Sequence, residues 1–339
     1  MSKHKVIAID LAKNVFQVCC INRNNRVIIN KALSRKGLTE FIAQQEPTII
    51  AMEACYSSHF WGRAFRDLGH TVKLIPAQHV TPFVRGNKSD KNDATAIAEA
   101  AQRPNIKPVP IKSIEQQDVQ TLHRMRERHI SQRTGLMNQA RGLLSEYGVV
   151  CSIGHKSFRE LLRKVGEPNS KHISPVLKVH FASILDEYYF HSEKIDEFDV
   201  NLRNIVTHNP LCQILLSIPG IGFINASALY SAIGDGSQFT NAREFAVWLG
   251  LTPKQFGSGG KTTSAGITKR GNRYLRKQLV HGARAITCMS KRKSDKFSLW
   301  INQLLARKGP NKTYVAVAAR LARIAWTLLD RKELYAAQT

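Results

Sequence analysis

The sequence predicts a mixed α/β domain followed by predominantly helical domains, and a change of pattern along the chain carries this prediction. Residues 5–75 contain five short apolar runs typical of strands, with helix-like segments between the later runs. From residue 111 onward, apolar residues recur at helical spacing over most of the chain. Residues 103–110 are interrupted by three prolines and indicate a linker. We therefore expect domains over residues 1–110, 111–205 and 206–339.

The first domain combines strands and helices around a central sheet. Strands are expected at 5–10, 16–21, 26–30, 48–53 and 71–75, and helices at 36–45, 57–68 and 90–102. Two of these strands end in an acid, Asp10 and Glu53. Because open α/β sheets expose their sites at the carboxyl ends of strands, both acids are candidate site residues.

The second domain is predicted to be a helical arm. Apolar residues follow a helical period from residue 111 to about 144, and a second long helical pattern covers 176–206. An irregular zone rich in Gly and Pro, 148–175, separates them. Two antiparallel helices of this kind form a coiled-coil-like arm, which is usually a spacer or a dimerisation element.

The third domain is expected to be mainly helical. Residues 215–233 contain Ile-Pro-Gly-Ile-Gly between two helical segments, which predicts a helix-hairpin-helix. Backbone N–H groups at Gly220 and Gly222 could hold a DNA phosphate without reading sequence, although an ordinary helix–helix turn would give the same pattern. Further helices are expected at 241–249, after Gly271 and at 313–329.

The charge of the chain indicates a nucleic-acid partner. Its 339 residues include 50 Lys and Arg against 25 Asp and Glu, a formal net charge of +25. Such an excess opposes compaction unless a polyanion neutralises it, and nucleic acid is favoured over acidic lipid. The sequence contains no signal peptide and no apolar run of about 18 residues, so we expect a cytosolic protein without a membrane partner. None of the six cysteines forms a CxxC pair, which favours a reducing compartment.

A serine in a glycine-rich stretch is a candidate nucleophile. Ser258 lies between Gly257 and the pair Gly259–Gly260, in a segment expected to be a flexible loop. Between residues 251 and 296 there are twelve Lys or Arg and one acid. A helical stripe of four cations is the expected footprint of a helix that binds a phosphate backbone. The candidate contacts are Lys261, Lys269 and Arg270, together with the stripe Arg273, Arg276, Lys277 and Arg284. No carboxylate near Ser258 could activate it.

Four acids elsewhere could supply that activation. Asp10 and Glu53 end strands, whereas Asp90 and Asp93 lie three residues apart at a helix start and therefore share a face. If the helix crosses the strand ends, four carboxylates converge and require a cation between them. Oxygen ligands suit Mg²⁺, or Mn²⁺, and such ions activate attacking and leaving oxygens at a phosphodiester. The alternative is that each acid is a cap or a surface group, and Asp90 by itself is more typical of an N-cap. Lys88 would be either a phosphate contact or a solvated lysine.

The order of these motifs resembles the DEDD transposases of the insertion-sequence-110 family, most closely the insertion-sequence-1111 branch. The resemblance rests on the segments AIDLAKNVFQV, AMEAC, LIPAQHV, GNKSDKNDA, SIPGIG, FAVWLGLTPKQFGSGGK and ITKRGNRYLR, and is weakest over residues 111–205. It departs from the family at Cys55–Tyr56, where many relatives carry a small residue and Gly, and this puts the local turn in question.

The resemblance implies a RuvC-like (ribonuclease-H-like) first domain, a coiled-coil arm and a C-terminal transposase domain. Asp10, Glu53, Asp90 and Asp93 match the family's Mg²⁺-binding tetrad, and Ser258 matches a serine that forms a covalent bond to DNA. It further implies a guide RNA encoded by the element, which selects donor and target DNA, a homo-oligomer from dimer to tetramer, and a bacterial, nucleoid-associated setting.

Two other interpretations of the residues remain open. The tetrad could act without the serine, as in a metal-dependent nuclease or junction resolvase that uses water. The chain could also be a non-enzymatic nucleic-acid-binding protein with a decayed site, although an intact tetrad and an intact glycine-rich serine segment argue against that.

Overall fold

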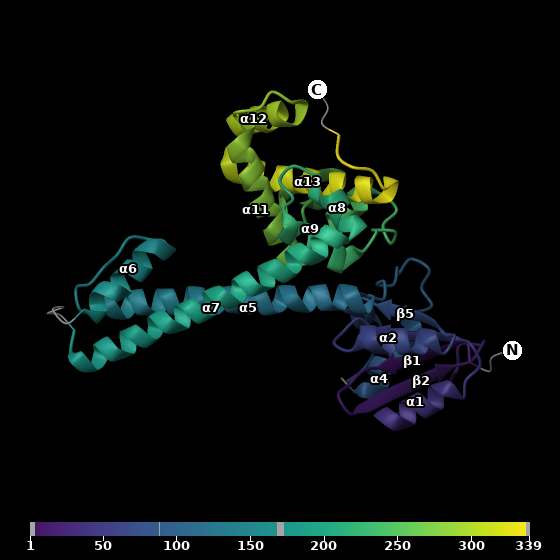
Figure 1. The fold of residues 1–339 in the computed structure, drawn as a ribbon. Helices are drawn as coiled ribbons and strands as arrows, with labels where there is room; N and C mark the ends of the chain where they lie inside the picture. Colours follow the sequence, from purple (N-terminus) through teal and green to yellow (C-terminus); the bar gives the residue numbers. More distant parts are fainter. Residues whose placement is uncertain (1–3, 88, 168–172, 337–339) are drawn as a thin grey trace. The chain divides into compact units, whose positions relative to one another are not determined.

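The computed structural model describes residues 4–87, 89–167 and 173–336, and the chain forms two compact units, Met1–Ser113 and Ile114–Thr339 (Figure 1). The first unit is mixed α/β and the second is mainly helical, which confirms the predicted fold class at this level. The division into three domains remains a prediction. Within the described residues, no helix is both long and apolar enough to cross a membrane.

The first unit is built on a five-stranded sheet. Its strands are β1 (Val6–Asp10), β2 (Val15–Ile21), β3 (Val27–Ser34), β4 (Ile49–Glu53) and β5 (Thr71–Ile75). The helical elements are α1 (Arg35–Ala43), α2 (Ser58–Asp67), α3 (Ala77–Val80), the 3₁₀ turn η1 (Thr81–Phe83) and α4 (Asp90–Ala100). The strand order is β3-β2-β1-β4-β5; β2 is antiparallel to both β3 and β1, whereas β4 is parallel to both β1 and β5.

Helices cover both faces of this sheet because its central strands are apolar at consecutive positions. Alternate side chains of a strand point to opposite faces. Val6 and Ala8 pack in the cluster that contains α4, whereas Ile7 and Ile9 pack in the cluster that contains residues of α1 and α2. The central strands are therefore buried on both sides, whereas the edge strand β3 is largely exposed.

The predicted linker, 103–110, returns to the sheet. The backbone N–H of Val109 donates to the carbonyl oxygen of Leu74 at 2.7 Å, in an isolated bridge beside β5. The segment 103–110 therefore belongs to the first compact unit, which ends at Ser113.

The second unit contains nine helices and one hairpin within the described residues. The helices are α5 (Ile114–Ser145), α6 (His155–Gly166), α7 (Pro175–His208), α8 (Pro210–Leu216), α9 (Phe223–Ile233), α10 (Ala242–Trp248), α11 (Arg273–Ser290), α12 (Lys296–Lys308) and α13 (Pro310–Arg331). The hairpin consists of β6 (Pro253–Ser258) and β7 (Lys261–Ile267).

Helices α5 and α7 lie side by side over much of their length, as the arm prediction requires (Figure 1). The zone 148–175 was expected to be irregular, and this expectation is wrong for α6. Phe158, Leu162 and Val165 lie on one face of α6 and are buried against α5 and α7. Glycine at both ends of α6 obscured this short amphipathic pattern.

The turn between α8 and α9 is packed tightly against α11. Gly220 has a φ of +87°, and a Cβ there would lie 3.0 Å from the carbonyl oxygen of Gly282. A Cβ at Gly282 would lie only 2.1 Å from the carbonyl oxygen of Gly220 and 2.8 Å from Nδ2 of Asn225. The two backbones therefore touch, and α11 takes its position from this contact.

We expect Gly282→Ala to destabilise the protein although alanine favours helices. In an open helix the exchange stabilises by about 1 kcal/mol, but overpacking against a backbone carbonyl costs about 1–3 kcal/mol. Gly135→Ala is the matched control, since Gly135 is inside α5 and no described heavy atom lies within 4 Å of its Cβ position. Urea unfolding should show a loss of stability for Gly282→Ala and a gain for Gly135→Ala. Stabilisation by both substitutions would refute the close contact.

Candidate functional site

The four predicted carboxylates converge at one end of the first unit. Asp10 ends β1 and Glu53 ends β4, and these strands are parallel neighbours with Ile9 paired to Met52. Helix α4 packs against β1 and β2, and Asp90 and Asp93 lie in its first turn. The N-cap of α4 is Ser89, whose side chain accepts from the N–H of Asn92. Asp90 is therefore not the capping group.

A chain of polar contacts holds the start of α4 on the sheet. Nε2 of Gln17, the residue paired with Asp10 across β1 and β2, donates to Oδ1 of Asn30 at 2.6 Å. Nδ2 of Asn30 then donates to the carbonyl oxygen of Lys91 at 3.2 Å. Lys91 lies between Asp90 and Asp93 in the first turn of α4. The two amide side chains therefore fix the position of that turn, and with it the positions of both acids. Gln17 and Asn30 are not predicted from the sequence, because amide side chains on strands form no recognisable motif.

The carboxylates perturb one another. The pKa of Asp10 is raised to about 6, first by burial and then by the negative charges of Asp93, Asp90 and Glu53. The pKa of Glu53 is also raised, by burial and then by Asp93. Mutual repulsion of this kind identifies a site where a cation would be stabilised.

The donor chemistry fits a hard cation, but the carboxylates do not form a closed cage. All four groups offer oxygen ligands, which suit Mg²⁺ or Mn²⁺. Within residues 4–87, 89–167 and 173–336, no three His, Cys, Asp or Glu side chains lie close enough to hold one ion. The groups are near enough to repel one another, and binding an ion would require them to move closer.

Cys55 also lies beside these acids. The pKa of its thiol is raised to about 11 by burial and then by Glu53 and Asp10. The turn that follows Glu53 accommodates Cys55–Tyr56 because the left-handed residue is Ser57, with a φ of +62°. Lys88 lies outside the described residues.

The serine segment is a β-hairpin, so the expectation of a flexible loop is wrong. Ser258 is the last residue of β6 and pairs with Lys261 at the start of β7. Gly259 and Gly260 form the two-residue turn, with φ of +55° and +78°. Two left-handed residues are what the tightest hairpin turn requires. The hairpin was missed because its strands lack an alternating apolar face.

The base of the hairpin is closed by direct backbone contact. Gly250 and Gly271 both have positive φ, and a Cβ at Gly271 would lie 1.9 Å from the carbonyl oxygen of Trp248. A Cβ at Gly250 would lie 2.0 Å from the carbonyl oxygen of Arg270. Nη1 of Arg276 donates to the carbonyl oxygens of Leu249 and Arg270, at 2.9 and 3.1 Å. One guanidinium group thus joins both sides of the base.

The predicted basic stripe on α11 divides into exposed and engaged cations. Arg273 is exposed, whereas Arg276 is occupied at the hairpin base. Lys277 forms an ion pair with Glu127 of α5. Arg284 is exposed, with its guanidinium 5.8 Å from the ring centre of Tyr314. On the hairpin and the segment after it, Lys261, Lys269 and Arg270 are exposed.

The two glycines of the α8–α9 turn have different environments. Gly220 faces α11, and its conformation is explained by packing. Gly222 is exposed, has open space around its Cβ position, and precedes α9 without a side-chain cap. Any phosphate contact at this turn would therefore involve Gly222 and the first turn of α9.

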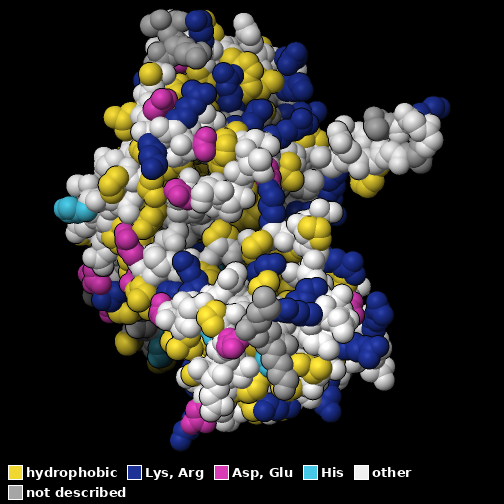
Figure 2. Space-filling view, turned by 90° about the vertical axis from the view of Figure 1, so that its right-hand side faces the viewer, with side chains coloured by type: hydrophobic (Ala, Val, Ile, Leu, Met, Phe, Trp, Pro, Cys, Tyr) yellow, Lys and Arg dark blue, Asp and Glu magenta, His cyan; other side chains and the backbone are white. Residues whose placement is uncertain are grey.

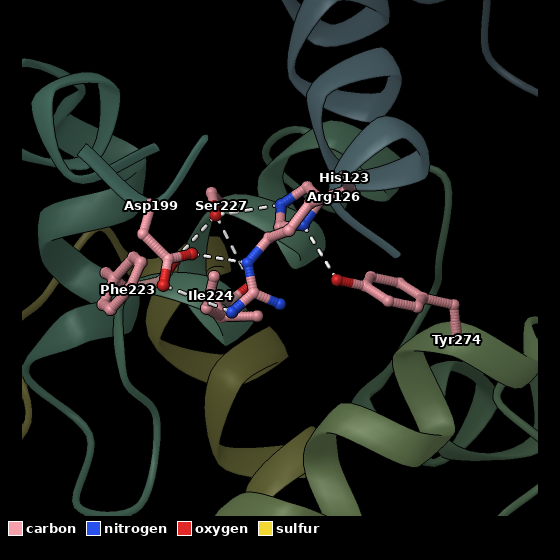
Figure 3. A network of polar contacts seen from close by, with 7 residues as sticks. All are labelled: His123, Arg126, Asp199, Phe223, Ile224, Ser227 and Tyr274. Atoms are coloured by element: carbon pink, nitrogen blue, oxygen red, sulfur yellow. Dashed lines mark hydrogen bonds and ion pairs between the residues drawn. The ribbon is translucent and has the colours of Figure 1, made fainter. Parts of the chain in front are cut away.

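A buried polar network joins α5, α9 and α11 (Figure 3). Oγ of Ser227 donates to the carbonyl oxygen of Phe223 at 2.7 Å, so it accepts from Nε2 of His123 at 3.0 Å. Nδ1 of His123 then accepts from the hydroxyl of Tyr274 at 2.9 Å. Arg126 of α5 forms an ion pair with Asp199 of α7 nearby. The network fixes the first turn of α11, immediately after the hairpin, to the arm helix.

The surface of the protein is strongly basic. Figure 2 shows Lys and Arg side chains spread over the viewed face, with fewer Asp and Glu among them. This distribution agrees with 50 basic and 25 acidic residues in the chain.

We expect Arg276→Ala to loosen the hairpin base. Hydrogen bonds from a charged donor contribute about 1.5–3 kcal/mol, so amides near the base should exchange at least about tenfold faster. Hydrogen exchange at the N–H groups of Thr268 and Lys269, which bond to Thr252 and Gly250, measures this directly. Arg273→Ala removes an exposed arginine from the same helix turn and should leave these rates unchanged. Equal rates in all three proteins would exclude a role for Arg276 at the base.

We expect His123 to make stability depend on pH. Burial, and then Arg126, lower its pKa from 6.5 to about 4. Between these values the unfolded state binds more protons than the folded state, so stability falls as the pH decreases from 6.5 to 4, by about 2–3 kcal/mol. Urea unfolding of wild type and His123→Gln across this range isolates the contribution. Parallel curves for the two proteins would contradict it.

Comparison with known proteins agrees with both units. The model of the Transposase IS116/IS110/IS902 family matches residues 212–298, and the transposase model named for the DEDD transposases of IS110 matches residues 7–149.

Relatives match over nearly the full length. A probable family 20 transposase of Pseudomonas aeruginosa is 42% identical over 97% of this chain and 98% of its own. The transposase for insertion sequence element IS1111A of Coxiella burnetii is 40% identical over 99% of this chain and 92% of its own. More distantly, a pilin gene-inverting protein of Moraxella bovis is 23% identical over 92% and 91%. The chain therefore belongs to the IS110 family: it is a DNA transposase, of the kind that mobilises insertion sequences, with an N-terminal DEDD domain and a C-terminal transposase domain.

Proposed function

We propose that this transposase is an RNA-guided DNA recombinase in which Ser258 is the nucleophile and the tetrad Asp10, Glu53, Asp90 and Asp93 assists with Mg²⁺. The main support for the proposal is that the serine hairpin and the carboxylate tetrad have complementary chemical groups. The serine hairpin lies in a basic stretch of the chain, since residues 251–296 contain twelve Lys or Arg and one acid. The carboxylates lie near enough to raise the pKa of Asp10, and a bound cation would offset their mutual repulsion. The serine hairpin has a nucleophile and positive charge but no carboxylates, and the tetrad has carboxylates but no nucleophile.

The proposed reaction is a transesterification at a DNA phosphodiester. The Ser258 oxygen attacks a DNA phosphorus, while the bond from phosphorus to the leaving sugar oxygen breaks. The proton of the serine hydroxyl passes through solvent to the leaving oxygen, which departs as a sugar hydroxyl. The exposed cations Lys261, Lys269 and Arg270 offset phosphate charge near the hairpin. A divalent ion, when bound by the tetrad, would supply electrophilic stabilisation of the oxygens. A second attack by a freed sugar oxygen releases the serine and completes strand exchange.

The partners follow from the same reasoning. A net charge of +25 suits a protein that holds donor and target DNA together with an element-encoded guide RNA. The tetrad and the serine lie in separate compact units. This arrangement suits a homo-oligomer, dimer to tetramer, in which the tetrad and the serine come from different subunits. The name of the Moraxella relative, a gene-inverting protein, further supports recombination over simple cleavage.

A covalent trap tests the proposal. The protein is mixed with its element-flanking RNA, Mg²⁺ and labelled donor and target DNA, then denatured and examined for DNA attached to protein. We expect an adduct with wild type, none with Ser258→Ala, and a decrease of at least about a hundredfold with Asp93→Asn. RNA binding by Asp93→Asn should remain close to wild type.

The alternative outcomes are distinct. DNA cleavage without an adduct, retained by Ser258→Ala and lost in Asp10→Ala, would indicate a water-based nuclease that uses the tetrad. Indifference of nucleic-acid binding to every substitution, with no cleavage at all, would leave only a binding protein.

A further inference from the structure

A groove on the second unit combines unpaired cations with aromatic rings. It lies between α12, α13 and the chain segment 332–336 that follows α13, and it has a volume of 630 Å³. A second hollow of 170 Å³ adjoins it, because Arg320, Ile324 and Tyr335 line both. None of the lining residues belongs to the serine hairpin or to α11, so the groove is separate from the site described above.

One face of α13 supplies most of the positive charge. Arg320, Arg323 and Arg331 recur at spacings of three and eight along the helix, which places them on one side. The opposite side, including Leu321 and Ala325, is buried in the core. Lys296 adds a fourth cation, and Glu333 is the acid among the lining residues. Among the described residues, none of the four cations forms an ion pair with a carboxylate, so their charge is available to a ligand.

Arg320 is oriented by the rings beneath it. Its guanidinium carbon lies 4.4 Å from the ring centre of Trp300 and 4.9 Å from that of Phe297. The two rings are nearly parallel, with an interplanar angle of 19°. A guanidinium positioned over aromatic rings loses less conformational entropy on binding, and its N–H donors are not used by the rings' carbon atoms. Such a fork is matched to two phosphate oxygens.

The far wall of the groove is also anchored. The backbone N–H of Tyr335 donates to Oγ of Ser217 at 2.9 Å, which fixes the segment after α13 to the turn after α8. Tyr335 is half-buried, and the pKa of its hydroxyl is raised, chiefly by burial. Tyr335 therefore has a defined place in the lining of the groove, together with Arg320.

We propose that this groove binds a single strand of nucleic acid, with the arginines on its phosphates and a base against the aromatic wall. A duplex keeps its bases stacked inside and presents phosphates to such a surface, so it would gain nothing from the rings. A single strand offers both groups, and grooves that combine Arg with aromatic residues are typical of single-strand binding. The volume suits one or two nucleotides and is comparable to that of small-ligand sites. The inference rests on the proposal that the protein handles nucleic acid, and it does not require Ser258 to react.

Binding of labelled oligouridylate and oligothymidylate across a salt series tests the groove. The measurements use the full chain carrying Ser258→Ala, so that no chemistry intervenes. We expect Arg320→Ala to weaken binding about tenfold and to reduce the salt slope by about 0.7 for the lost phosphate contact. Arg307→Ala is the matched control, since Arg307 is an exposed arginine of α12 outside the groove. Arg307→Ala should change affinity less than Arg320→Ala.

The two probes distinguish RNA from DNA as the bound strand. A loss with both identifies a phosphate-and-base site common to RNA and DNA, and a loss with oligouridylate only identifies an RNA site. A loss with oligothymidylate only identifies a DNA site. Unchanged affinity and slope for both strands would overturn the proposal.

A second measurement covers the possibility that Arg320→Ala disturbs the packing of Phe297 and Trp300. Arg320→Lys retains the charge without the planar fork and should bind with intermediate affinity. With Arg320 intact, a photoreactive 4-thiouridine strand should cross-link to peptides that contain Trp300 or Tyr335. Cross-links found only elsewhere would refute the groove. Failure of the covalent trap with intact groove binding would reject the serine mechanism and leave this inference standing.

Discussion

Direct contact between backbones determines the arrangement of the second unit. At Gly220–Gly282 the turn between α8 and α9 rests on α11, and at Gly250–Gly271 the two sides of the hairpin base meet. A Cβ at these points would approach a carbonyl oxygen to between 1.9 and 3.0 Å. No side chain could replace these contacts without moving α11. The position of the basic helix, and of the hairpin that precedes it, therefore depends on four glycines.

The carboxylate end of the first unit stores electrostatic strain. The pKa of Asp10 is raised to about 6, which means that its ionised form is disfavoured in the folded protein. Burial and three neighbouring acids cause it, and amide contacts through Gln17 and Asn30 hold α4 in place in spite of it. A fold retains such an unfavourable cluster where a bound cation can reverse the sign of the interaction.

The sequence predicts the first unit better than the second. The pattern of short apolar runs predicted all five strands, and the acids that end two of them lie at one end because β1 and β4 pair in parallel. The short helical turns α3 and η1 were not predicted. The hairpin around Ser258 was not predicted, since its exposed strands have no apolar alternation and are defined by turn geometry and a backbone contact. The sequence correctly placed Arg276 and Lys277 on α11. Their spacing could not show that Arg276 donates to backbone carbonyl groups or that Lys277 forms an ion pair with Glu127. Contacts between residues far apart in sequence decide these cases.

The boundary at Ser113–Ile114 places the carboxylates and the serine in separate compact units. Neither unit contains a complete set of reacting groups under the proposed mechanism. Strand cleavage would then require a metal ion at the carboxylates and DNA at the hairpin at the same time. Its frequency would depend on the product of these two occupancies. Under that mechanism, such a dependence would limit unwanted cleavage by a transposase, because an encounter of either unit alone with DNA would have no chemical consequence.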